Sequence, residues 1–535
     1  MAIAVRLVLA RDGAWQSSDS FHYFALADAI HEHGAFESGG SQHPDLSRSP
    51  LYPTLVAATR FLVPDTATAG FLVSLLASVG AMFAIARLAG DLFGPGAKRA
   101  GLVLGAVSPV GVMALPSLPD PLLVALLLAS ASSIWRARDS GSFRPALEAG
   151  VWAGLATLTR AEGIAYPLAA AALAVACGGG RARLGARVRN GALILACGAA
   201  MYAPWAWYAS QRLGRTMFAP GFEYVAGQRA LADAIEARYW NYPGLDWTDV
   251  VLFAPTADHG GTLWTRWFET GRVPELDPRV LPASMKDASV PAATTGRGGT
   301  WLQPSRWLRR AGIVQSNLPR ALRGLWSERL VTVSTLVLGV VAAIALAGSR
   351  RRQEAWFLAG VGVWASLPLA SHVEYRFLFP WTGLGAVVAS ACWRTFATRP
   401  SIGIAVALLV GVDTLSAPRP AHGLRDDPQG LVRLVRDANL PPGPLMATRS
   451  GVPYLSGRPY RPLPVGGPEV VADALHATGS VAVVVETAAD LDRRPDVGAL
   501  LEDPPPPPWR IAGRIPSGTR GEYRLLVVSH EATIP

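Results

Sequence analysis

The chain has 535 residues, of which 50% are hydrophobic and 16% are charged. This balance is too apolar for a soluble globular protein of this length, and its apolar stretches are long enough to cross about 30 Å of hydrocarbon. The net charge of +10 does not indicate a nucleic-acid binder, because the arginines lie in short loops between apolar runs instead of on one basic face. Composition therefore predicts an α-helical polytopic membrane protein and excludes nucleic acid as a partner.

Apolar segments rich in Ala, Leu, Val and Gly recur along the chain, and each is predicted to span the membrane. They are 66–89, 100–116, 121–136, 146–160, 163–178, 191–209, 329–348, 354–371, 377–394 and 401–417. The topology also requires a helix before Asp19, and Met1 to Ala10 is about half the length that a span needs. We expect that the sequence begins inside this helix, which gives about eleven transmembrane helices.

Basic residues mark one side of the predicted bundle. They are Arg87, Lys98, Arg99, Arg136, Arg138, Arg144, the arginines of 181–189 and 350–352, Arg394 and Arg399. By the positive-inside rule this side is cytoplasmic. The other side receives 12–65, the turn at 118–121, the junctions at 160–163 and 371–376, the segment 210–328, and everything after 418. We therefore expect an inner (plasma) membrane protein whose notable polar residues face the extracytoplasmic, or periplasmic, side.

The chain divides into a transmembrane domain, 1–418, and a small extracytoplasmic domain, 419–535. The segment 210–328 is rich in Trp, Pro and Gly and contains no full-length apolar run, which is typical of an external loop with short interfacial helices. After 418 the pattern changes to helices near 431–439, 468–477 and 495–502, and to strand-like runs at 444–448 and 480–486. A hairpin is predicted from 509–515 and 523–528, so this domain is expected to be α/β.

The first external loop contains an acid, an aromatic helix and a proline-rich run: Ser18-Asp19-Ser20, Phe21 to His31, and Arg48-Ser49-Pro50-Leu51-Tyr52-Pro53. Asp19 has two interpretations. It is either the N-cap of the helix that follows or a carboxylate that accepts a proton or holds a metal ion.

Two later turns also carry charge. Asp120 lies between two prolines, where it would cap a helix and could line the same cavity as Asp19. Arg160 and Glu162 interrupt two apolar runs, and they form either a solvated ion pair in a tight turn or, for Arg160, a cation facing a lipid phosphate.

The run Ser371-His372-Val373-Glu374-Tyr375-Arg376-Phe377 lies at an external helix junction. On a helix His372 and Arg376 would share a face, with Glu374 turned away, so both could reach one anion. The alternative is that these residues anchor a helix end at the membrane interface.

These motifs resemble those of the GT-C glycosyltransferases, of the protein O-mannosyltransferase and lipid A aminoarabinose transferase kind. The similarity extends over residues 12–210 and 329–394. It implies that Asp19 is the catalytic carboxylate, with Asp120 in the same cavity, and that the donor is a polyprenyl-phosphate sugar. The carrier phosphate would be bound by Arg376, His372, Arg160 and Arg48, with Glu374, Glu162 and Tyr52 in supporting positions.

The resemblance leaves metal use open. A divalent ion could be held by Asp19 and Asp120, but the first loop offers one acid at Asp19 where the protein mannosyltransferases carry two adjacent ones. No other cofactor is expected.

We therefore expect hexosyl or pentosyl transfer, with inversion, at the extracytoplasmic membrane face. The partners are the lipid-linked donor, membrane lipid, and an acceptor that is a protein, a glycan or a lipid. The alternative functions are a transporter or flippase of lipid-linked sugars, a non-catalytic scaffold or receptor, and a transferase of oligosaccharides or phospholipid head groups.

Overall fold

The computed structural model describes most of the chain. It covers residues 18–37, 48–108, 117–139, 143–177, 184–221, 247–257, 262–270, 274–280, 352–366, 379–415, 428–487, 495–516 and 521–529, with a few residues between 223 and 231.

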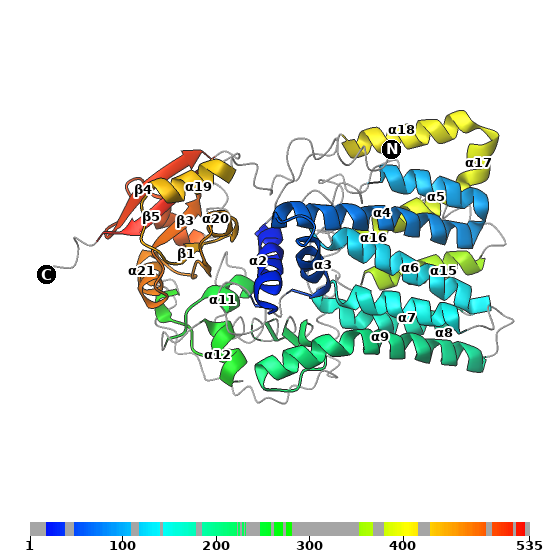
Figure 1. Cartoon of the computed structure of the whole chain (residues 1–535), viewed down its shortest axis with the longest axis horizontal. Coiled ribbons are helices and arrows are strands. Elements are labelled where there is room, and N and C mark those ends of the chain that lie inside the picture. Colours follow the sequence, from blue (N-terminus) through cyan, green and yellow to red (C-terminus); the bar gives the residue numbers. More distant parts are fainter. Residues whose placement is uncertain are drawn as a thin grey trace.

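Helices that run side by side form a bundle (Figure 1). They are α4 (Thr66–Phe93), α5 (Pro95–Val107), α6 (Asp120–Asp139), α7 (Arg144–Thr157), α8 (Ala165–Ala176), α9 (Leu184–Leu213), α15 (Arg352–Ala365), α16 (Phe379–Ala389) and α18 (Pro400–Leu415). The short helix α17 (Trp393–Thr398) precedes α18 and runs across its end (Figure 1). Single 3-10 turns, Ala161–Ile164 and Ser390–Cys392, precede α8 and α17. A helix thus occupies every predicted span except 329–348, which lies outside the described residues. Among the helices that the structure describes, α4, α6 and α9 are long and apolar enough to cross a membrane.

The ends of α4 follow from local chemistry. Asp65 caps the helix, because its carboxylate accepts a hydrogen bond of 2.7 Å from the backbone N–H of Thr68. Gly94 ends the helix with a φ of 94°, a conformation that favours glycine. Pro95 then begins α5, where the missing N–H of proline has no helical partner to lose.

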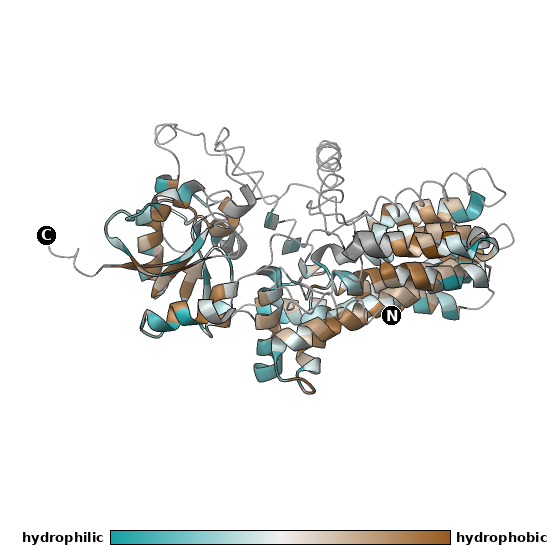
Figure 2. Ribbon diagram, turned by 90° about the horizontal axis from the view of Figure 1, so that it is seen from above, coloured by the Kyte–Doolittle hydropathy of each residue, from teal (hydrophilic) through white to brown (hydrophobic). Residues whose placement is uncertain are grey.

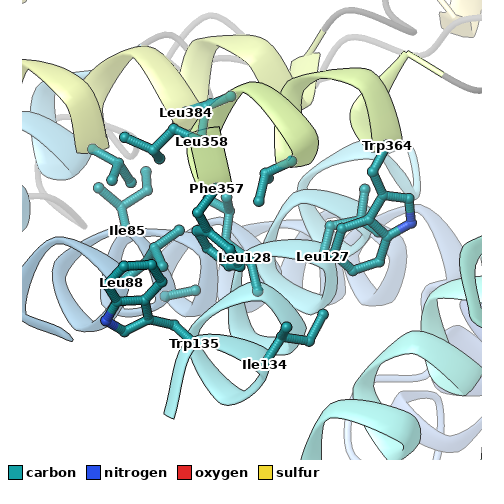
Figure 3. Packing of buried hydrophobic residues seen from close by; sticks show 14 of the residues in the cluster. Ile85, Leu88, Leu127, Leu128, Ile134, Trp135, Phe357, Leu358, Trp364 and Leu384 are labelled. Carbon is teal, nitrogen blue, oxygen red and sulfur yellow. The ribbon is translucent and has the colours of Figure 1, made fainter. Parts of the chain in front are cut away.

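The core of the bundle is apolar and joins helices from both ends of the transmembrane domain. Figure 3 shows Ile85 and Leu88 of α4, Leu128 of α6, Phe357 of α15 and Leu384 of α16 packed together. In Figure 2 the bundle helices are coloured mainly as hydrophobic residues. Residues from the apolar runs before 210 and after 351 thus share one hydrophobic core.

The first external loop supplies two helices, α2 (Ser18–His33) and α3 (Leu51–Thr59). They lie between the bundle and the C-terminal domain (Figure 1). The described part of 210–328 forms the short helices α11 (Trp247–Phe253) and α12 (Leu263–Thr270) and a 3-10 turn, Pro278–Val280. Their apolar core includes Val465 of the C-terminal domain, whose N–H donates to the carbonyl of Phe253 at 3.2 Å.

The C-terminal domain is α/β, as predicted. Its elements are α19 (Pro428–Asp437), β1 (Leu445–Ala447), α20 (Gly451–Leu455), β2 (Tyr460–Pro462), α21 (Pro468–Ala477), β3 (Ala482–Glu486), the 3-10 helix η8 (Pro495–Leu501), β4 (Trp509–Pro516) and β5 (Glu522–Val528). The strand order is β2-β1-β3-β5-β4, with β1 parallel to both its neighbours and β5 antiparallel to both of its own.

Both faces of this sheet are covered. Ala482 and Val484 pack on the side of α19, while Val483 and Val485 pack on the side of α21 and η8. This alternation is the expected period of two along a strand. The domain is therefore a three-layer unit with β3 at its centre.

Candidate active site around the first external helix

Asp19 lies in the first turn of α2 and forms an ion pair with Arg48. The distance from Arg48 Nη2 to Asp19 Oδ1 is 2.6 Å, and the side chains are 24% and 21% exposed. Helix α2 begins at Ser18, two residues earlier than an N-cap at Asp19 would require. The carboxylate instead lies where the helix dipole favours negative charge. The contact with Arg48 orients it toward the loop that leads into α3.

Tyr52 joins this loop to the bundle. Its side chain is fully buried, and its hydroxyl donates to the carbonyl of Gly70 at 3.0 Å and lies 2.8 Å from Ser74 Oγ. Burial raises the pKa of Tyr52 well above its usual value, so the phenol keeps its proton. The ring of Tyr23 meets that of Tyr52 edge-on at 5.2 Å, and the guanidinium of Arg48 lies 5.7 Å from the Tyr23 ring. Tyr52 is therefore suited to support the site and not to exchange protons.

Asp120 and Arg160 form a second and more deeply buried pair. The distance from Arg160 Nη1 to Asp120 Oδ1 is 2.8 Å, and the side chains are 10% and 2% exposed. The side chain of Arg160 thus lies against the start of α6 instead of in solvent, and its predicted pairing with Glu162 lies outside the described residues. Asp120 is itself the first residue of that helix. A buried pair of this kind contributes little net stability, because desolvation of the charges offsets their attraction. Its presence therefore favours a functional role over a stabilising one.

Hydrogen bonds connect the segments that carry the two ion pairs. The N–H of Leu51, three residues after Arg48, donates to the carbonyl of Leu158, two residues before Arg160, at 2.9 Å. Ser74, which contacts Tyr52, donates to the carbonyl of Leu118 beside the start of α6 at 3.0 Å. The polar residues predicted from the first loop, from 120 and from 160 therefore gather at one end of the bundle.

The third predicted cluster lies outside the described residues. The structure does not describe His372, Glu374 or Arg376, and it does not describe the side chain of Glu162. The nearest described helix, α16, has Gly383 one turn from its start, and a Cβ there would lie 3.0 Å from side-chain atoms of Val124 and Leu128 of α6. Because Val124 is likewise one turn from the start of its helix, α16 and α6 begin at the same end of the bundle.

The described residues do not form a metal site by themselves. No group of three or more His, Cys, Asp or Glu side chains comes together among them. Asp19 and Asp120, the predicted ligands, each contact an arginine. This donor set does not fit a divalent ion, so metal binding remains a prediction that would need ligands from elsewhere in the chain.

Sequence reasoning missed a further polar contact on α2. Tyr454 of α20 donates to Asp28 Oδ2 at 2.8 Å, and Arg60 Nη1 lies 3.0 Å from Asp28 Oδ1. The only sequence signal at Asp28 is a charge within the aromatic helix, and nothing in the sequence pairs it with a residue of the distal domain.

Residues 43–208 match the family model described as dolichyl-phosphate-mannose-protein mannosyltransferase. This range covers less than a third of the chain. It contains Arg48, Asp120 and Arg160 but begins after Asp19. No curated protein matches the chain.

Two solved structures are similar to the whole chain. The apo oligosaccharyltransferase of Archaeoglobus fulgidus is 11% identical, with a TM-score of 0.53 over 94% of this chain and 72% of that one. ArnT of Cupriavidus metallidurans is 14% identical, with a TM-score of 0.44 over 100% of this chain and 98% of that one. The archaeal likeness shows a shared fold, and with the family model it confirms the resemblance to the GT-C glycosyltransferases.

Proposed function

We propose that this chain is a GT-C-type membrane glycosyltransferase, which transfers a sugar from a polyprenyl-phosphate donor to an acceptor at the extracytoplasmic membrane face. The observation that carries this proposal is the meeting of two acid–arginine pairs, Asp19 with Arg48 and Asp120 with Arg160, at one end of an apolar helical bundle. Arg48, Asp120 and Arg160 lie within the range matched by the mannosyltransferase family model. A structure of the archaeal enzyme AglB, in complex with an inhibitory peptide and a dolichol-phosphate, supports a lipid phosphate as the carrier of the donor sugar.

Asp19 is the proposed general base. The hydroxyl or amide of the acceptor attacks the anomeric carbon of the sugar, and its proton passes to the Asp19 carboxylate. The bond between the anomeric carbon and the phosphate oxygen breaks, and its electron pair leaves with the polyprenyl phosphate. Arg48 orients the base through Oδ1. Attack opposite the leaving phosphate inverts the configuration of the anomeric carbon.

Cations on the other side of the sugar stabilise the departing phosphate in this proposal. Arg160 is held by Asp120 at the start of α6, where the N-terminal end of the helix dipole also favours an anion. Arg376 and His372 precede α16, which begins at the same end of the bundle. Asp120 therefore acts as a positioning residue for Arg160, and Glu374 and Glu162 keep the supporting roles predicted for them.

The proposed side of the membrane follows from the charges at the two ends of α6. Asp120 begins this 20-residue helix, and Arg136 and Arg138 lie in its last turn. A helix of that length is about 30 Å long, which matches the thickness of the hydrocarbon core. Arg136 contacts Glu148 at 2.6 Å at the basic end. The positive-inside rule makes this end cytoplasmic and the Asp120 end extracytoplasmic.

The test is transfer by purified protein in liposomes, with radiolabelled polyprenyl-phosphate sugars as donors and a membrane extract as the source of acceptors. Asp19→Asn is expected to lower the rate by at least about a hundredfold, the contribution of a general base. Asp65→Asn is the matched control, because Asp65 is an exposed acid of the same loop that caps α4, and asparagine caps equally well. Equal transfer by wild type and Asp19→Asn would overturn the catalytic assignment.

The flippase alternative is separated in the same liposomes. A flippase would move the labelled donor lipid between leaflets when no acceptor is present. The donor lipid would stay chemically intact with both the wild type and Asp19→Asn. The glycosyltransferase releases free polyprenyl phosphate only when acceptor is added. Extraction of the product into solvent, protein or glycan fractions then identifies the class of acceptor.

A further inference from the structure

The C-terminal domain contacts the helix that carries Asp19. Helix α20 lies beside α2 (Figure 1), and the ring of Tyr454 packs against Phe21 at 5.5 Å and Phe24 at 6.0 Å between ring centroids. A second contact comes from Tyr460, whose ring meets that of His22 edge-on at 5.6 Å. These residues lie within two turns of Asp19. The distal domain therefore covers the first half of α2.

The hydroxyl of Tyr454 makes this contact specific. It donates to Asp28 Oδ2 at 2.8 Å, while Asp28 Oδ1 accepts a hydrogen bond of 2.6 Å from Thr66 Oγ1 and lies 3.0 Å from Arg60 Nη1. Burial and the nearby Asp28 carboxylate raise the pKa of Tyr454 well above its usual value, so the hydroxyl remains a donor. One carboxylate thus joins four elements: α2, the end of α3, the start of α4 and α20.

Helix α2 is also seated closely on the bundle. A Cβ added to Gly70 of α4 would lie 2.5 Å from the ring of Phe24, so only glycine admits that ring. Phe24 is thereby packed between α4 on one side and Tyr454 on the other. Movement of α20 would release one of the two surfaces that fix α2.

We propose that Tyr454 is a positioning residue, which holds α2 through Asp28, Phe21 and Phe24 and so fixes Asp19 for the transfer reaction. This inference rests on the proposed function, because it assigns Tyr454 a role in the use of Asp19. Its consequence is that the C-terminal domain takes part in catalysis by fixing the base. A displacement of about 1 Å at a reacting group is enough to lower a rate by about a hundredfold.

Tyr454→Phe is the decisive variant, since it keeps the ring against Phe21 and Phe24 and removes only the donor to Asp28. Its kcat is expected to fall by about tenfold or more, with the KM for the donor lipid unchanged. Tyr523→Phe is the matched control: it removes a hydroxyl that contacts Glu486 at 3.4 Å inside the C-terminal domain, away from α2. Rates are compared per molecule of protein that elutes as a single folded species.

Hydrogen exchange tests the contact without any substrate. In the full-length protein, Tyr454→Phe is expected to speed exchange of amides in 18–33 while 481–487 and 522–528 keep their protection. An unchanged kcat with unchanged exchange in 18–33 would overturn the proposal, as would faster exchange with wild-type kcat, which would make Tyr454 structural only. If wild-type protein transfers no sugar, the proposed function fails, and the exchange experiment still decides whether Tyr454 holds α2.

Discussion

Removal of one partner from the Asp120–Arg160 pair should destabilise the protein far more than removal of both. Arg160→Met leaves the Asp120 carboxylate, 2% exposed, without the guanidinium that lies 2.8 Å away. Removal of one partner from a buried ion pair costs about 3–5 kcal/mol. The double variant Asp120→Leu, Arg160→Met replaces both charges by apolar groups of similar volume. Its stability is expected to equal or exceed that of the wild type, because such replacements are neutral or stabilising by about 1–4 kcal/mol.

Thermal unfolding of the purified protein in one detergent measures this difference, and the transfer assay measures its functional counterpart. The double variant is expected to be folded and inactive, which would separate the role of the pair in the reaction from any role in stability. Full activity in the double variant would refute the functional interpretation of Asp120 and Arg160. If Arg160→Met were as stable as the wild type, the buried geometry of the ion pair, on which the expected destabilisation rests, would be refuted.

Two further predictions concern packing and pH. A Cβ added at Gly150 of α7 would lie 2.8 Å from the carbonyl oxygen of Ile194 on α9. Gly150→Ala should therefore separate these helices and destabilise the protein by about 1–3 kcal/mol. The control Gly185→Ala should leave the unfolding temperature unchanged, because no atom lies within 4 Å of the added Cβ. In the C-terminal domain, hydrogen bonds from Arg514 lower the pKa of Asp503. Their contribution to stability should therefore be present above about pH 4 and disappear as the pH falls through the lowered pKa, so the unfolding temperatures of wild type and Arg514→Ala should converge in acid.

The fold was predictable where signals are local. The apolar run 66–89 predicts most of α4, which continues to Phe93, and the runs 509–515 and 523–528 predict the β4–β5 hairpin. The helix predicted at 495–502 is a 3-10 helix, Pro495–Leu501. In the C-terminal domain β2 and α20 were missed, because the half-buried β2 has no apolar run and a helix of five residues is too short to show a period.

The composition of the candidate site was more predictable than its contacts. Asp120 and Arg160 stand out in the sequence as charges between apolar runs, but their ion pair depends on how α6 and α7 pack. The contact between Asp28 and Tyr454 joins residues 426 positions apart and runs through α20, one of the missed elements. Polar residues at span ends can therefore be identified from sequence, whereas their partners follow only from the tertiary structure.

The charges of the described site bear on how a donor would bind. Asp19 and Asp120 each contact an arginine, so the guanidiniums of Arg48 and Arg160 already bind a carboxylate before a donor arrives. A lipid phosphate would therefore have to share these guanidiniums with the carboxylates, which the five N–H donors of an arginine allow. The junction before α16 contains His372 and Arg376, and α16 begins at the same end of the bundle as α6. We therefore propose Arg376 as a further cation for the carrier phosphate, beside the paired Arg160.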